Sequence, residues 1–427
     1  MIKIYDMETL EEREILFRGG SGADVSAPVA EILRAVQERG DAALREYTLR
    51  FDGAAPDALA VTAEEVDQAA AQVEPAFLAV LEEAAEHIRA YHARQKRESF
   101  VMTEREGVVL GQRIIPLARV GIYVPGGTAA YPSTVLMNAI PARIAGVGEI
   151  IMVTPPGRDG AVNPHILAAA KIAGVTRIYK VGGAQAVAAL AYGTGTIPQA
   201  DKIVGPGNAY VAEAKRQVFG RVNIDMIAGP SEVLVLADGR SNPAWVAADL
   251  LSQAEHDRMA AAVLVTDSRP LAEAVAHELE RQLAALPRAE IARASLEANG
   301  KLIVCRDLRE GIAVANRIAP EHLELCVDNP FDYLGEIQNA GSVFLGRYNP
   351  EPMGDYFAGP NHTLPTMGTA RFYSPLSVDD FVKKSQFSYY TRDALARDYR
   401  KVSLFARKEG LDAHARAVDI RFEGGEA

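Results

Sequence analysis

The stretch Arg119-Val-Gly-Ile-Tyr-Val124 decides the fold, because it is the first of several short apolar runs that alternate with helical segments. Its β-branched and aromatic residues are typical of a strand. A Gly-rich turn separates it from a helical segment over Ser133–Ala145. Strands that alternate with helices form parallel sheets covered by helices. The sequence therefore predicts an α/β protein.

The alternation runs in two series. Strands are expected at Arg119–Val124, Glu149–Val153, Arg177–Val181 and Lys202–Val204, and then at Val233–Ala237, Ala261–Val265, Leu302–Cys305, Leu323–Val327 and Ser342–Leu345. Helices are expected in the intervals. The pattern predicts two Rossmann-like (incomplete) parallel-sheet domains, with a hinge near Asp225–Ser231.

Both ends of the chain are predicted to be helical. Thr62-Ala-Glu-Glu65 is a capping box that opens a helix, and Pro75–Glu98 has the amphipathic pattern of another. A strand pair is expected from Val101 to Ile115. No strand is expected after Phe372, and Thr391–Val418 is predicted to be a helical tail interrupted at Gly410.

Composition excludes several classes of protein. The chain has 427 residues and a net charge of −11, without a basic stripe for nucleic acid. No apolar run reaches the length of a membrane helix, and the N-terminus lacks the apolar core of a signal peptide. The two cysteines, Cys305 and Cys326, lie in apolar runs and are expected to be buried free thiols. Reduced thiols favour a cytoplasmic protein.

The segment Pro320-Glu-His-Leu-Glu-Leu325 places a carboxylate, Glu321, beside an imidazole, His322. Two unlike proton acceptors side by side suit a reaction that takes one proton from a hydroxyl and another from water. The alternative is a surface pair at the end of a helix.

Two Gly-rich turns follow predicted strands, Val124-Pro-Gly-Gly-Thr128 and Gly205-Pro-Gly-Asn208. Such turns let a backbone approach an anionic ligand at a helix N-terminus. Neither has the complete G-x-G-x-x-G fingerprint, although Asp225 lies about where a ribose-binding acid is expected. The sequence allows two interpretations of these turns, a degenerate dinucleotide site and an ordinary tight turn.

Polar groups that could bind a metal accompany four histidines. His256 follows Gln253 by three residues on a predicted helix over Pro243–His256, His322 follows Glu321 directly, His362 follows Asp355 by seven residues, and His414 follows Glu409 by five. Imidazole, carboxylate and amide groups can together bind zinc. No standard metal motif is present, so histidines with a structural role are the alternative.

Ten ordered segments resemble histidinol dehydrogenase over nearly the whole chain. They are Gly121–Gly127, Ser133–Met137, Val181–Gln185, Gly205–Asn208, Gly229–Glu232, Gln253–His256, Pro320–Glu324, Gly354–Asp355, Asn361–His362 and Glu409–His414. The resemblance implies a zinc-dependent, NAD-linked oxidation of L-histidinol to L-histidine through bound L-histidinaldehyde, the last step of histidine biosynthesis.

The resemblance also implies roles for single residues. Zinc, one ion per subunit, would be held by Gln253, His256, Asp355 and His414. Substrate would contact Ser231, Gln253, His256, His322, Asp355, His362, Glu409 and His414, and NAD would contact Tyr123, Gln185 and Asn208. Glu321 and His322 would be catalytic, with His322 as the base of both oxidations and Glu321 activating water for the second.

The resemblance also implies a homodimer whose subunits exchange their C-terminal tails, so Glu409 and His414 would complete the partner's site. The expected divisions are a helical segment over residues 1–24, a catalytic α/β domain of residues 25–124 and 232–375, a second α/β domain on the NAD side over 125–231, and the helical tail over 376–427.

Other functions are also open. A relative on the same scaffold could oxidise another small polar alcohol, such as a sulfonated propanediol. A zinc hydrolase could use Glu321 as its base, and a regulatory protein could bind zinc without catalysis. The paired Glu321 and His322 argue against the regulatory protein, and the Gly-rich turns argue against the hydrolase.

Overall fold

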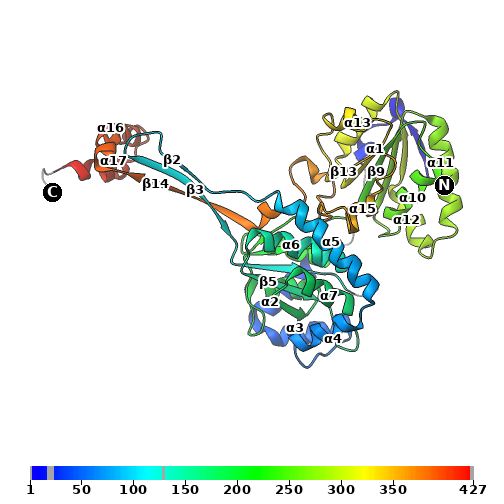
Figure 1. The fold of residues 1–427 in the computed structure, drawn as a ribbon, viewed down its shortest axis with the longest axis horizontal. Coiled ribbons are helices and arrows are strands. Elements are labelled where there is room, and N and C mark those ends of the chain that lie inside the picture. Colours follow the sequence, from blue (N-terminus) through cyan, green and yellow to red (C-terminus); the bar gives the residue numbers. More distant parts are fainter. Residues whose placement is uncertain (1, 17–23, 127–129, 424–427) are drawn as a thin grey trace. The chain divides into compact units, whose positions relative to one another are not determined.

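The computed structural model describes residues 2–16, 24–126 and 130–423. The chain divides into two compact units (Figure 1). Unit 1 comprises Met1–Lys96 and Leu117–Phe381, and unit 2 comprises Arg97–Pro116 and Val382–Ala427. None of the helices in the described part of the chain has the length and apolar composition needed to cross a bilayer.

Unit 1 contains a five-stranded sheet in which all neighbouring strands are parallel. Its order is β6 (Arg177–Lys180), β5 (Glu149–Thr154), β4 (Arg119–Tyr123), β7 (Lys202–Val204) and β8 (Asn223–Ile224). Its strands are almost continuously buried, because helices cover a parallel sheet on both faces. The helices that follow its strands are α6 (Pro132–Ala145), α7 (Pro164–Ala173), α8 (Gly183–Tyr192) and α9 (Ala209–Val218).

The N-terminal helices pack on this five-stranded sheet. They are α2 (Ser26–Arg39), α3 (Asp41–Asp52), α4 (Ala63–Gln72) and α5 (Pro75–Ala93). Helix α2 contacts α8 and α9, α4 contacts α7, and α5 contacts α6. The predicted capping box at the start of α4 is confirmed. The expected division placed residues 25–124 with residues 232–375, whereas the apolar faces of α2 and α3 are buried in the core of the five-stranded sheet, and α4 and α5 contact its helices α7 and α6.

Unit 1 also contains a six-stranded parallel sheet. Its order is β1 (Ile4–Asp6), β11 (Lys301–Val304), β10 (Ala261–Thr266), β9 (Glu232–Ala237), β12 (His322–Cys326) and β13 (Ser342–Leu345). The two parallel sheets confirm the predicted fold class. The N-terminal segment was expected to be helical, but it begins with the edge strand β1, which is too short to show a period in the sequence.

Two apolar cores lie on the two faces of the six-stranded sheet. On one face, α10 (Pro243–Ala254), α11 (Arg269–Leu283) and α12 (Ala289–Asn299) bury alternate residues of β9. The other face is covered by α13 (Leu308–Ile318) and α1 (Glu12–Leu16). Short helices α14 (Phe331–Leu334) and α15 (Glu351–Tyr356) flank β13 in the chain. Because side chains alternate along a strand, His322, Glu324 and Cys326 of β12 share the face that α10 covers.

Unit 2 is an antiparallel sheet followed by two helices. Strand β3 (Val108–Pro116) lies between β2 (Phe100–Met102) and β14 (Val382–Tyr390), and β3 and β14 form a long ribbon (Figure 1). Helices α16 (Arg392–Lys408) and α17 (Asp412–Asp419) pack on each other. The prediction of a helical tail over 376–427 is wrong at β14, whose exposed polar pattern becomes a strand only by pairing with distant β3. The break at Gly410 is confirmed.

Candidate active site

Glu321 and His322 lie at the amino end of strand β12. Both are buried, with 7% and 4% of their surface exposed, so the alternative of a surface pair is wrong. The neighbouring strand β9 begins at Glu232, whose backbone N–H donates to Oε2 of Glu321 at 2.8 Å. The backbone oxygen of Glu232 lies 2.9 Å from Nδ1 of His322. One peptide edge of β9 thus orients both side chains.

The contact with Glu232 fixes the tautomer of His322. A backbone oxygen only accepts, so Nδ1 carries the proton and Nε2 is left as the acceptor. Nε2 is buried and has no hydrogen-bond partner among the residues described. Burial lowers the pKa of His322, and the nearby charge of Asp355 opposes this shift only in part. The imidazole is therefore neutral at physiological pH, with its basic nitrogen available.

Two carboxyl groups face this nitrogen. Nε2 of His322 lies 3.7 Å from Oε1 of Glu351 and 4.0 Å from Oδ1 of Asp355. Asp355 also lies beside His362, with 3.8 Å between Oδ1 and Nδ1. Nδ1 of His362 is held at 3.0 Å from the backbone oxygen of Asp355, and burial lowers the pKa of its ring. The Asp355 carboxylate therefore lies close to two neutral imidazoles.

Glu321 differs from an ordinary glutamate in its environment. Burial, above all, raises its pKa well above the usual value, and the hydrogen bond from Glu232 opposes this only in part. The carboxylates of Glu232, Asp355 and Glu351 raise it further. A carboxylate with a raised pKa is a stronger base once it is ionised.

Gln253 and His256 come from the end of α10. The predicted helix over Pro243–His256 ends at Ala254, and His256 lies exposed in the following turn, where its N–H bonds to the backbone oxygen of Gln253. Gln253 is buried, and its Oε1 accepts no hydrogen bond from the described residues. An unpaired buried acceptor is expected of an atom that faces a ligand. The amide, imidazole and carboxylate donors fit a zinc ion.

The other residues predicted to contact the substrate or the metal are Ser231, Glu409 and His414. Ser231 is half-buried and directly precedes β9. Glu409 follows α16 and His414 lies on α17, both exposed and both in unit 2. Gln253, His256 and Asp355 belong to unit 1. The predicted metal ligands are thus divided between the two units.

Tyr123 and Asn208 lie where the strand order of the five-stranded sheet reverses. From β4 the chain adds β5 and β6 on one side and then β7 on the other, so β4 and β7 flank a topological switch point. Parallel sheets bind ligands outside the carboxyl ends of strands at such points. Tyr123 ends β4, and Asn208 follows β7 and caps α9 by accepting from two backbone N–H groups.

Of the side chains predicted to contact NAD, Tyr123 has a hydrogen-bond partner and Gln185 has none among the described residues. The Tyr123 hydroxyl accepts from the N–H of Gly183 at 3.1 Å, and burial raises its pKa to about 12. Gln185 is buried, and both atoms of its amide lack partners in the described part of the chain. Part of the first Gly-rich turn, residues 127–129, lies outside the described residues.

Asp225 does not have the position expected of a ribose-binding acid. Its carboxylate accepts from the N–H of Gly205 at 2.8 Å and forms a buried ion pair with Lys215. Gly205 has a φ of +111°, and a Cβ there would lie 2.2 Å from the backbone oxygen of Tyr123. Asp225 therefore holds this tight turn against β4.

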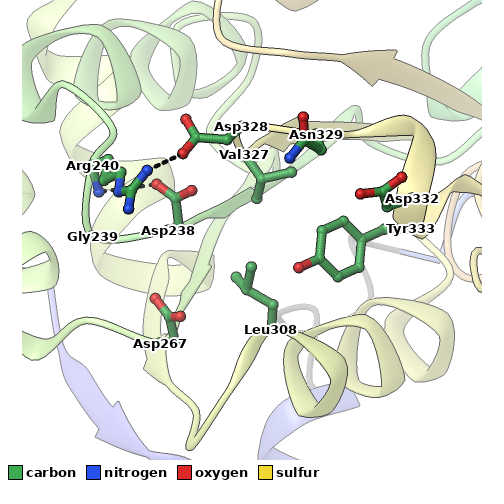
Figure 2. Close-up of a pocket in the computed structure, with 10 residues that line it drawn as sticks. All are labelled: Asp238, Gly239, Arg240, Asp267, Leu308, Val327, Asp328, Asn329, Asp332 and Tyr333. Atoms are coloured by element: carbon green, nitrogen blue, oxygen red, sulfur yellow. Dashed lines mark hydrogen bonds and ion pairs between the residues drawn. The ribbon is translucent and has the colours of Figure 1, made fainter.

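A cavity of about 550 Å³ lies at the carboxyl ends of β9, β10 and β12 (Figure 2). Asp238 and Asp328 in its wall both pair with Arg347, and Arg240 points toward Asp328. The cavity contains none of the residues singled out in the sequence. His322 and Glu232 begin their strands, so the candidate site lies at the opposite edge of the sheet.

Sequence reasoning missed Glu232, the half-buried Asp249, and the buried acids Glu324 and Glu351. The ligand atoms of Glu351, His322 and Asp355 lie within 4.8 Å of one another. Glu351 precedes Asp355 by four residues, the spacing that places two side chains on one face of a helix. That spacing was a usable signal, but the approach of Asp249 to Glu324 had none.

Comparisons with known proteins agree with one another. The histidinol dehydrogenase family model matches residues 18–422. A histidinol dehydrogenase of Listeria monocytogenes is 55% identical over 416 residues, covering 97% of both chains. One of Geobacter metallireducens is 57% identical over 424 residues, covering 98% of this chain and 97% of that protein. The crystal structure of the Elizabethkingia anophelis histidinol dehydrogenase superposes with a TM-score of 0.94 at 41% identity, covering 99% of this chain and 98% of that chain.

Proposed function

Because the chain belongs to the histidinol dehydrogenase family, a family of NAD-dependent oxidoreductases, we propose that it oxidises L-histidinol to L-histidine in two successive steps. The observation that carries this proposal is the buried, neutral His322, whose unpaired Nε2 faces two carboxyl groups. Oxidation of an alcohol needs a base at this kind of position to take the hydroxyl proton.

His322 acts as the base of both oxidations. Nε2 takes the hydroxyl proton of the alcohol in the first step, returns it to the aldehyde oxygen as water adds, and takes a hydroxyl proton of the aldehyde hydrate in the second step. The contact of Nδ1 with the backbone oxygen of Glu232 keeps a proton on Nδ1, so Nε2 is the nitrogen that gains and loses a proton. The aldehyde stays bound between the steps, which prevents loss of a reactive intermediate.

Glu321 removes the proton of the water that attacks the aldehyde. Its hydrogen bond from Glu232 fixes Oε2, and its raised pKa makes it a stronger base than an exposed glutamate. Water supplies the second oxygen of the carboxylate product. Glu321 is therefore needed for the second oxidation and not for the first.

Zinc would be held by Gln253, His256 and Asp355, with His414 as the fourth protein ligand. The buried, unpaired Oε1 of Gln253 supports this assignment. When bound, the metal would orient the substrate through its nitrogens. Ser231 and His362 would line the substrate pocket, and Glu409 would contact the substrate amine as an opposite charge.

NAD would bind at the switch point of the five-stranded sheet, in contact with Tyr123, Gln185 and Asn208. The position of Tyr123 and Asn208 beside that point and the unpaired buried amide of Gln185 support the assignment. When bound, NAD accepts the hydride of each oxidation. The residues of the chain only position it.

The protein would work as a homodimer that exchanges unit 2, so that Glu409 and His414 enter the partner's site. Exposed apolar side chains of unit 2, among them Phe387, Tyr389, Leu404 and Phe405, support a surface that a second copy covers. The cytoplasm suits such a biosynthetic enzyme, and both cysteines are free and buried.

The test is formation of NADH by the purified, zinc-loaded protein with L-histidinol, compared with a sulfonated propanediol at equal concentration. We expect turnover of histidinol and at most a trace with the propanediol. NADH from the propanediol alone would contradict the proposal and identify a relative with another alcohol substrate. Hydrolysis of an ester without any effect of NAD would favour the zinc hydrolase instead.

A further inference from the structure

Glu324 is a buried acid of the motif that carries the catalytic pair, and the proposed chemistry does not use it. It lies two residues after His322 on β12, so both side chains emerge on the same face of the sheet. Only 1% of its surface is exposed. Oε1 accepts from the backbone N–H of Glu351 at 2.7 Å, at the first residue of α15. Glu324 therefore ties α15 to β12.

Another acid lies beside Glu324. Carboxyl oxygens of Glu324 and of Asp249, on α10, lie within 4.8 Å of each other and of Sγ of Cys326, and Oε2 of Glu324 is buried without a hydrogen-bond partner among the described residues. Neither acid forms an ion pair with any residue that the structure describes. Two facing carboxyl groups without a cation are held together by a shared proton. Burial raises the pKa of Glu324 to about 9, in agreement with such a proton.

The two helices that Glu324 joins also carry proposed zinc ligands. Asp249 precedes Gln253 by four residues on α10, and Glu351 precedes Asp355 by four residues on α15. This spacing places each pair of side chains on one face of its helix. We propose that the Asp249–Glu324 carboxyl pair positions Gln253 and Asp355 relative to His322. The inference rests on the proposed function of that site.

A cation site of Asp249, Glu324 and Cys326 is a poorer explanation. Burial raises the pKa of the Cys326 thiol, so that it stays protonated, whereas metals bind the thiolate. Glu324 already uses Oε1 for the backbone of α15. The pair therefore acts through hydrogen bonds, as outer partners that orient metal ligands do.

The test compares Glu324→Ala and Glu324→Gln with Leu325→Ala in the full-length protein. Leu325 is the next residue of β12, is equally buried, and packs in the core on the opposite face of the sheet. Zinc affinity is measured by competition with a chromophoric chelator, and kcat and KM are measured with histidinol. The melting temperature of each variant gives its loss of stability.

We expect Glu324→Ala to weaken zinc binding and lower kcat/KM by about 10–100-fold each, the usual effect of losing an outer partner of a metal ligand. The amide of Glu324→Gln can still accept from the backbone N–H of Glu351 and can donate to the carboxylate of Asp249. We therefore expect this variant to have a zinc affinity and a kcat/KM within about threefold of wild type. Leu325→Ala should lose stability and retain zinc affinity.

Two results would overturn the proposal. Wild-type zinc affinity in a folded Glu324→Ala protein would show that the pair does not position the ligands. A loss of zinc affinity in Leu325→Ala as large as that in Glu324→Ala would show that the effect comes from a general loss of stability. Failure of the wild-type protein to oxidise histidinol would refute the proposed function alone, because the zinc affinities would still compare the variants.

Discussion

At the scale of the residue, His322 is the group on which both oxidations depend. Substitution His322→Asn keeps a similar shape but removes the basic Nε2 that faces Glu351 and Asp355. We expect the oxidation of histidinol and that of histidinaldehyde each to fall by about 10²–10⁴-fold, the usual contribution of a general base. NADH formation from each substrate measures this. His277→Asn is the matched control, because His277 is exposed on α11.

Glu321 should distinguish the two steps. Glu321→Gln retains the hydrogen bond from Glu232 but cannot take a proton from water. We expect the rate with histidinaldehyde to fall by about 10²-fold or more and the first oxidation to change by less than about threefold. Rapid-mixing measurements of the first and second NADH test this. Equal losses in the two steps would refute the separate roles of Glu321 and His322.

At the scale of the element, the carboxyl pair between α10 and β12 predicts a dependence of stability on pH. Burial, and then the neighbouring charge of Asp249, raise the pKa of Glu324 in the folded protein from its ordinary value of 4.5 to about 9. The folded state therefore binds more protons than the unfolded state between these values, and stability falls as pH rises through that window. Glu324→Gln removes the titrating group.

Chemical denaturation of the two proteins at several pH values measures this effect. Relative to Glu324→Gln, wild-type protein should become less stable from about pH 5 to about pH 9, and the difference should then level off. A difference that is constant over this range would show that Glu324 is ionised in the folded protein.

The sequence predicted the parallel strands other than β1 and β8, and most of their helices, because each of these is a local apolar run with its own period. It did not predict β14, which is exposed and is a strand only through its distant partner β3. The site shows the same limit. Glu321 and His322 are neighbours in the chain, but the approach of Asp249 to Glu324 depends on how α10 lies on the sheet.

At the scale of the whole molecule, the account requires that unit 2 of one chain completes the site of another. His322→Asn and His414→Asn proteins, each inactive, should therefore complement each other after mixing and exchange of subunits. Half of the dimers would be mixed and would have one intact site of two, so about a quarter of wild-type activity should return.

The measured activity is formation of L-histidine, which needs both His322 and Glu321. The control mixes His322→Asn with Glu321→Gln, whose changes lie at the same end of β12 and cannot complement each other in forming this product. If His322→Asn and His414→Asn gave no more activity together than this control pair, the two residues would act within one chain, and the exchanged tail would be refuted.

The most direct test of the central claim is the ratio of NADH formed to L-histidinol consumed by the zinc-loaded protein with excess NAD. Oxidation of an alcohol to an acid removes four electrons, and each NAD accepts two, so the account predicts a ratio of two with L-histidine as the product. A ratio of one with accumulation of histidinaldehyde would contradict it, because His322 and Glu321 would then support only the first oxidation.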